Sequence, residues 1–268
     1  MKIRIGYDIA YESSQPIPML LMLSIEESRI ADLLTPHRIV FGPPTAERVF
    51  RDGFGNICTR LIAPPGTFAM SLDALVADRG TPDIVAPEAE QLPVDLLPDE
   101  TLVFLLGSRY CETDQLSDTA WSLFGGVAPG WSRVQAICEF VHRHMTFGYD
   151  YARPTRTAWE GFNERLGVCR DFAHLAITLC RCMNIPARYC TGYLGDIGVP
   201  PADAPMDFSA WFEAYLGDRW YTFDARHNQP RIGRVVMARG RDATDAAIST
   251  SFGPSQLIRF KVITEEVR

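Results

Sequence analysis

The spacing of apolar residues changes twice along this chain, and this change restricts its fold more than any other feature. From Lys2 to Tyr11 apolar and polar side chains alternate, which is typical of a strand with one buried face. From Val134 to Met145 the apolar residues recur at the spacing of one helix face. Strand patterns return after Ala187. We therefore expect an α+β protein with a β-rich N-terminal region.

A segment rich in proline and acidic residues, 81–100, separates the two kinds of pattern and indicates a connector. The chain has 268 residues, which fits one large domain or two small ones. We expect a β-rich N-terminal domain over residues 1–110 and a core domain over residues 111–268.

Charge and composition argue against several classes of partner. The net charge is −7 and the chain has no basic cluster, so we expect neither nucleic-acid binding nor binding to an anionic membrane. The longest apolar run, Ile17 to Ile25, is much shorter than the ~20 residues that span a bilayer.

The N-terminus and the cysteines indicate the compartment. Residues 1–6 alternate charged and apolar side chains and lack the apolar stretch of a signal peptide. Seven cysteines, an odd number, favour free thiols in a reducing environment. We therefore expect a cytoplasmic protein.

A β-hairpin can be predicted in register. Two strand patterns, Ala210–Leu216 and Arg219–Asp224, flank the turn pair Gly217-Asp218. This register places Ser209 and Asp224 on one face as diagonal neighbours, roughly 7–8 Å apart at the backbone. A histidine at position 209 would reach the Asp224 carboxylate, whereas a serine is too short to do so.

Cys169 is the candidate nucleophile. Gly167 permits a tight turn, and a predicted helix begins at or just after the cysteine. The positive end of the helix dipole and the unpaired N–H groups there favour the thiolate, which is the nucleophilic form. The same N–H groups can hold an oxyanion.

The sequence resembles the bacterial transglutaminase-like superfamily, of the kind described as cysteine proteases. Three ordered motifs carry the resemblance: 167–175 with 184–193, then Asp207–Tyr215, then Trp220–Asp224. The resemblance implies a papain-like, transglutaminase-like core, in which the helix carrying Cys169 packs on an antiparallel sheet. It also implies a Cys–His–Asp triad with Cys169 as nucleophile, Asp224 as acid and residue 209 as base.

The base position departs from the family, because it holds Ser209. A serine cannot accept the thiol proton near neutral pH or return it to a leaving amine. We therefore predict that amide hydrolysis by this chain is weak or absent. Among the other histidines, His174 lies about 140° around the helix from Cys169 and is expected to pack in the core. His227 falls on the face opposite Asp224 unless the chain bends.

Four further residues are candidates for the oxyanion site or for substrate contacts. Either Tyr149 or Tyr151, some twenty residues before the nucleophile, is a candidate for the oxyanion site by resemblance. Arg170 is a candidate for attracting an acidic group, and Trp211 for lining the cleft. No metal-binding pattern is present, and no cofactor is implied.

Three functions remain open at this stage. The first is a thiol hydrolase or peptidase scaffold that acts on peptide or protein amides through a Cys169 thioester, impaired by the histidine-to-serine change. The second is a natural pseudoenzyme that binds a peptide or amide ligand. The third is an acyltransferase with an amine acceptor, because hydrolysis and transfer use the same thioester.

Overall fold

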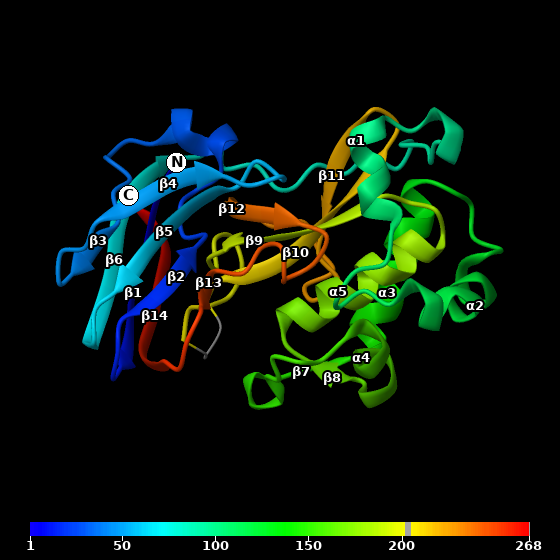
Figure 1. Cartoon of the computed structure of the whole chain (residues 1–268). Helices are drawn as coiled ribbons and strands as arrows, with labels where there is room; N and C mark the ends of the chain where they lie inside the picture. Colours follow the sequence, from blue (N-terminus) through cyan, green and yellow to red (C-terminus); the bar gives the residue numbers. More distant parts are fainter. Residues whose placement is uncertain (202–204, 268) are drawn as a thin grey trace.

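The computed structural model describes residues 1–201 and 205–267. A β-rich half carries both termini, and a helix-rich half lies beside it (Figure 1). Within the described ranges, the β-rich half contains two four-stranded sheets, ordered β14-β1-β6-β3 and β13-β2-β5-β4. Their strands are β1 (Lys2–Ser13), β2 (Ile17–Leu21), β3 (Val40–Gly42), β4 (Glu47–Arg51), β5 (Ile57–Ala63), β6 (Gly66–Ala77), β13 (Ser249–Ser251) and β14 (Gln256–Val267).

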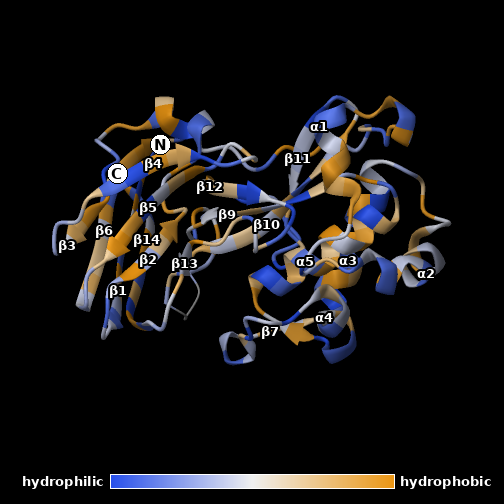
Figure 2. Cartoon of the chain, viewed as in Figure 1, coloured by the Kyte–Doolittle hydropathy of each residue, from blue (hydrophilic) through white to orange (hydrophobic). Residues whose placement is uncertain are grey.

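The alternation near the N-terminus forms one face of a core. Ile3, Ile5, Tyr7 and Ile9 of β1 are buried in a cluster that includes side chains of β2, β5 and β6. Hydrophobic colouring runs along the strands of this half in Figure 2. The cluster also contains Tyr193 of the helix-rich half. The two halves therefore share apolar packing.

The last strand returns to the first. β14 pairs antiparallel with β1, from Lys2 opposite Val267 to Glu12 opposite Gln256. The C-terminal segment thus lies in the β-rich half, and its Val262 packs in the same cluster as Val235 and Met237 of β12 (Val235–Gly240). The sequence-based boundary near residue 110 stays a prediction.

The helix-rich half contains an antiparallel sheet ordered β11-β10-β9-β12. Its central helix α5 (Cys169–Cys182) packs on β9 and β10 and against α2, α3 and α4. The other elements of this half are α2 (Thr113–Phe124), α3 (Trp131–His144), β7 (Thr146–Phe147), η4 (Tyr149–Tyr151), α4 (Ala158–Glu164), β8 (Leu166–Gly167), β9 (Ala187–Tyr193), β10 (Ser209–Leu216), β11 (Arg219–Phe223) and β12 (Val235–Gly240). This helix on an antiparallel sheet confirms the predicted fold class.

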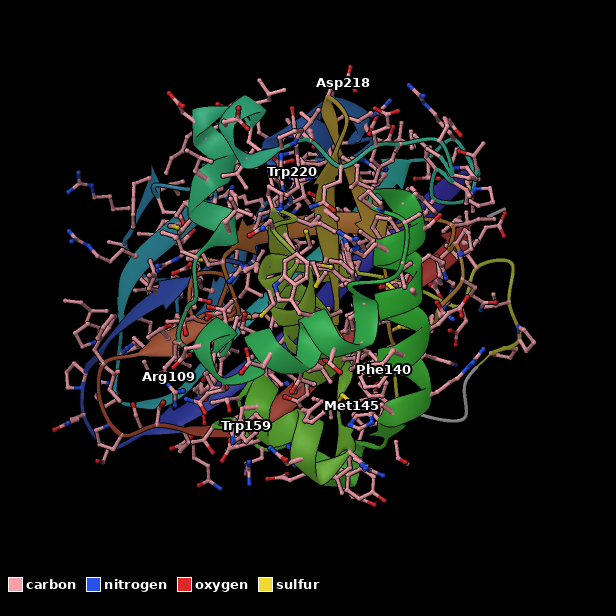
Figure 3. All side chains as sticks on the ribbon, turned by 90° about the vertical axis from the view of Figure 1, so that its right-hand side faces the viewer. Arg109, Phe140, Met145, Trp159, Asp218 and Trp220 are labelled. Atoms are coloured by element: carbon pink, nitrogen blue, oxygen red, sulfur yellow. The ribbon has the colours of Figure 1, made fainter. Side chains whose placement is uncertain are left out.

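The two faces of β10 have different surroundings. Ala210, Phe212 and Ala214 point into the core around α5. Trp211 and Glu213 point to the other side, toward the β-rich half. Figure 3 shows the helical side, with Phe140 and Met145 along α3 and Asp218 at the tip of the β10–β11 hairpin.

The connector between the halves contains little regular secondary structure, as its composition predicts. It contains η2 (Val94–Leu96), α1 (Asp99–Leu102) and η3 (Val103–Leu105), while η1 (Glu27–Asp32) belongs to the β-rich half. In the part of the chain that the structure describes, no helix is long and apolar enough to cross a membrane.

Candidate active site around Cys169

The start of α5 is held by a buried carboxylate. Oδ2 of Asp171 accepts a hydrogen bond from the Val168 N–H at 3.0 Å, which caps the helix one residue before Cys169. The same oxygen pairs with Arg156 at 3.0 Å, and Oδ1 pairs with Arg170 at 2.9 Å. Because the Asp171 side chain has no exposed surface, these contacts fix where the helix begins. They therefore fix the position of Cys169.

Cys169 differs from the other cysteines in its exposure. It is partly exposed, whereas the remaining six are buried, and all seven are free thiols. Burial raises the pKa of Cys169 to about 11, although the positive charge of Arg226 and the N–H of Ala210 oppose the increase. Asp207 adds to it through its negative charge. Desolvation therefore outweighs the opposing effects of Arg226 and Ala210, which favours the protonated thiol at neutral pH.

The predicted hairpin register is correct. Leu216 lies opposite Arg219, and the pairing continues to Phe212 opposite Phe223. The ladder ends there, one residue before Asp224. Ser209 begins β10 and lies opposite Gly192 of β9. The Ser209 hydroxyl is buried and has no hydrogen-bond partner, so it does not bridge to Asp224.

Asp224 is held by a turn and by two side chains. Its Oδ1 accepts hydrogen bonds from the N–H groups of Arg226 and His227, each at 3.0 Å. Its Oδ2 accepts from Nδ1 of His227 at 2.8 Å and from Nη2 of Arg234 at 2.9 Å. Arg234 and His227 keep the pKa of Asp224 well below its ordinary value, even though burial alone would raise it. Asp224 is therefore a carboxylate at all ordinary pH values.

The chain bends immediately after Asp224, and this bend redirects His227. Helix α3 holds the bend, because Nδ1 of His142 bonds the carbonyl of Arg226 at 2.9 Å. Gln135 of the same helix donates to Asn228 at 3.1 Å. An extended strand would place His227 on the face opposite Asp224. The turn instead brings its ring onto the carboxylate.

A small cavity lies beside Ser209. Its volume is about 40 Å³, and Tyr149, Asp207, Ser209, Arg226 and His227 are among its lining residues. A cavity of this volume has room for about two or three water molecules. The space next to the short serine side chain is thus only partly filled, and the imidazole of His227 borders it.

The structure separates the candidate tyrosines. Tyr149 lines the small cavity, and burial raises its pKa, with further influence from the charges of Arg226 and Cys169. Tyr151 instead lays its ring beside Gly148. Of the two tyrosines, Tyr149 therefore lines the cavity beside Ser209, and an oxyanion role for either one stays a prediction.

The other two candidates lie away from the cavity. Arg170 pairs with Asp171 and stacks over Tyr110, 5.8 Å from the ring centroid. Trp211 is buried with Cys190 and Val236 behind the sheet. Neither residue lines the cavity beside Ser209, and their roles in substrate contact stay predictions.

Sequence reasoning missed two arginines. The guanidinium of Arg226 lies 3.8 Å from the Phe147 ring centroid and exerts its charge on Cys169. Arg234 pairs with Asp224 from ten residues further along the chain. Arg234 has no local pattern that marks it, whereas the hairpin register alone already places Arg226 on the same face as Ser209 and Asp224.

No metal site accompanies this arrangement in the described residues. Across 1–201 and 205–267, no three or more histidine, cysteine, aspartate or glutamate side chains gather as metal ligands would.

A helix that starts at Cys169 and packs on an antiparallel sheet gives the chain a papain-like, transglutaminase-like fold. Comparison with known proteins indicates the same class of fold. The family model of the transglutaminase-like superfamily matches residues 118–225. A Cytophaga hutchinsonii protein described as a "putative cysteine protease" is 33% identical in sequence. The two structures superpose with a TM-score of 0.85, covering 99% of this chain and 90% of that one.

Mycobacterial relatives are also similar. The uncharacterized protein Rv2569c of Mycobacterium tuberculosis is 28% identical over 233 residues, which are 78% of this chain and 73% of the relative. The uncharacterized protein ML0607 of Mycobacterium leprae is 36% identical over 88 residues, or 30% of each chain. This chain belongs to the transglutaminase-like superfamily.

Proposed function

We propose that the chain is a thiol hydrolase scaffold that acts on peptide or protein amides through Cys169. The Cys169 thiolate attacks the carbonyl carbon, and the amine leaves with a proton. Water then hydrolyses the thioester, releasing the acid and restoring the thiol. The observation that carries this proposal is the position of the partly exposed Cys169 at the start of α5, next to the β10 position that holds Ser209.

Turnover by the chain as it stands is expected to be weak. The raised pKa of Cys169 keeps most of the thiol protonated, and Ser209 offers no group that can remove the proton. General acid–base catalysis usually contributes about 10²–10⁴-fold, and Ser209 supplies none of it.

The test is the Ser209→His variant, assayed with a casein or peptide-amide panel. We expect turnover to rise by about 10²–10⁴-fold. The matched control is Ser209→Gln, which fills similar space without a titratable group. Cys169→Ala in the histidine background must abolish the gain. If Ser209→His folds and gains no more than Ser209→Gln, the assignment of position 209 as the base is wrong.

A second candidate is that His227 acts as the base in the existing chain. Its hydrogen bond to Asp224 and its place on the cavity beside Ser209 favour this role. In that case His227→Gln alone removes the residual hydrolysis, whereas in the first case it does not.

The same variants also test two other functions, acyl transfer and peptide binding without turnover. An acyltransferase would form a new amide when a primary amine is added, and product analysis with and without the amine separates it from a hydrolase. A pseudoenzyme would bind peptide without turnover, even after the histidine is supplied. The seven free thiols support a cytoplasmic location, which cell fractionation tests.

A further inference from the structure

A large cavity lies on the opposite side of the core sheet from α5. Its volume is about 700 Å³, within the range of sites that bind small molecules. Trp211 and Glu213 of β10 form one wall, and Asp78 and Arg79, just after β6, form another. It therefore lies between the β-rich half and the core sheet, and junctions of this kind are common places for ligand sites.

The acidic residues that line this cavity are already paired. Asp32 and Asp78 pair with Arg29 at 2.7 and 3.1 Å. Asp83 pairs with Arg234 at 2.9 Å. Glu213 pairs with Arg239 at 3.1 Å and also with Arg188. No lining carboxylate in the described residues is left to attract a cation.

Some guanidinium N–H donors, by contrast, lack an acceptor, although Arg231 already pairs with Asp196 and Arg234 with Asp83 and Asp224. Arg79 has neither an ion pair nor a hydrogen bond within residues 1–201 and 205–267, and it is exposed. Nη1 of Arg234 and Nε of Arg231 are buried and lack hydrogen-bond partners. An unpaired buried donor on a charged group is costly, so these arginines gain from an acceptor that the protein itself does not supply. Guanidinium groups match the paired oxygens of carboxylate and phosphate.

We propose that this cavity binds a small organic anion that carries a carboxylate or a phosphate, with Arg79, Arg231 and Arg234 as its cationic contacts. The volume exceeds that of an inorganic ion, which favours an organic ligand. Binding requires a small shift of the Arg234 and Arg231 side chains to turn their unpaired nitrogens toward the ligand.

Arg234 connects the cavity to the candidate active site. Its Nη2 donates to Oδ2 of Asp224, which also holds His227. An anion that draws Arg234 away from Asp224 therefore changes the charge around the carboxylate, and with it the reactivity of Cys169. The ligand is thus expected to regulate the thiol site from behind the sheet.

The test measures the melting temperature of the full chain during titration with citrate and with inorganic phosphate. Sodium chloride at matched ionic strength is the reference. We expect a saturable rise of about 5–10 °C at about 100 times the dissociation constant. A larger rise with citrate identifies the carboxylate class, and a larger rise with phosphate identifies the phosphate class.

Two variants locate the site. Arg79→Gln should raise the dissociation constant at least about tenfold, because it removes a charge-assisted contact. Arg48→Gln is the matched control, since Arg48 is exposed, has no ion pair in the described residues and lies on β4 outside the cavity. Arg231→Gln tests the second contact if the first variant is unstable. A rise no greater than that with chloride, or one unchanged in both cavity variants, overturns the proposal.

The regulatory step has its own readout, which does not depend on turnover. At saturating ligand, the rate of Cys169 alkylation by iodoacetamide at pH 8 should change at least twofold. The change should be absent in Arg234→Lys, which keeps the charge and loses the forked contact. An unchanged rate in the original chain with the ligand demonstrably bound overturns the coupling.

Discussion

Nδ1 of His227 lies 2.8 Å from Oδ2 of Asp224, so a histidine three residues after the acid occupies the acceptor oxygen that a base at position 209 would use. Arg234 shares that oxygen at 2.9 Å. A new histidine at 209 must therefore compete with two existing donors. This relationship shows why the acid position can remain charged and ordered without the base.

Replacing Asp224 should separate the two candidate bases. In the Ser209→His background, Asp224→Ala is expected to lower turnover by about 10³–10⁴-fold, because an alanine has no acceptor to orient the imidazole and no charge to stabilise the imidazolium. His227→Gln in the same background should cost less than about tenfold, since Arg234 keeps the carboxylate in place. The measurement is kcat for a peptide amide. Equal losses in the two variants would identify His227 as the working base.

The local parts of the site could be predicted from sequence. The hairpin register follows from the two-residue turn at Gly217-Asp218, and the start of α5 follows from Gly167 and the apolar spacing after Cys169. Both depend on residues that are close in the chain. The alternation of β1 likewise predicted its buried face, because a period of two assigns side chains to faces without knowledge of the partner strand.

The remaining parts depend on contacts between distant segments. The bend at residues 225–227 is held by His142 of α3, some eighty residues earlier, so the sequence around His227 could not show whether the strand continues or bends. The return of β14 to β1 joins the two ends of the chain. The degree of burial of Cys169 likewise depends on distant segments, so the sequence shows the helix start but not the desolvation that raises the pKa of the thiol.

Alkylation should select Cys169 among the seven cysteines. It is the one partly exposed thiol, while burial raises the pKa values of Cys58 and Cys111 to about 11 and hides their sulfur atoms. We expect one label per folded chain, counted by intact mass after iodoacetamide treatment. The labelling rate should rise about tenfold per pH unit from pH 7 to 10, because the thiolate fraction does so below a pKa of about 11.

The Ser209→His variant should move this profile to lower pH, because an imidazolium beside the sulfur stabilises the thiolate. Ser209→Gln is the control and should leave the profile in place. Two or more labels per chain at pH 8, or a label that persists in Cys169→Ala, would show that the assigned thiol is not the reactive one.

Asp171 should be a large contributor to stability. Its replacement by asparagine leaves Arg156, which is 4% exposed, with the more exposed Glu164 in place of a fully buried carboxylate partner, and weakens the cap at Val168. Breaking a buried pair typically costs about 3–5 kcal/mol. The melting temperature should then fall by roughly 6–20 °C.

The matched control for that change is Asp114→Asn in the first turn of α2, where the carboxylate is exposed. It should cost less than about 1 kcal/mol. Faster alkylation of misplaced Cys169 in Asp171→Asn would accompany the loss of stability. If Asp171→Asn and Asp114→Asn have the same melting temperature, Asp171 does not fix the helix start.

His174 should make the fold sensitive to acid well above the range of ordinary carboxylates. Its ring is fully buried and stacks on Tyr110, with centroids 5.0 Å apart. Its Nε2 accepts the Ala243 N–H at 3.1 Å, which requires the neutral ring. Burial lowers the pKa of His174 to about 3, whereas an unfolded histidine titrates near 6.5. The unfolded chain therefore binds the proton first as pH falls.

The contribution of neutral His174 to the free energy of unfolding is complete above pH 6.5. It is lost as pH falls toward 3, at about 1.4 kcal/mol per pH unit. Between pH 7 and 4.5 the free energy of unfolding in urea should thus drop by about 3 kcal/mol more in the original chain than in His174→Gln. Glutamine can still accept the Ala243 N–H but does not titrate. His37, whose pKa burial also lowers, is present in both proteins and cancels in the difference. Equal slopes in the two proteins would mean that His174 has the same pKa in the folded and the unfolded chain, so that its burial against Tyr110 does not lower the pKa.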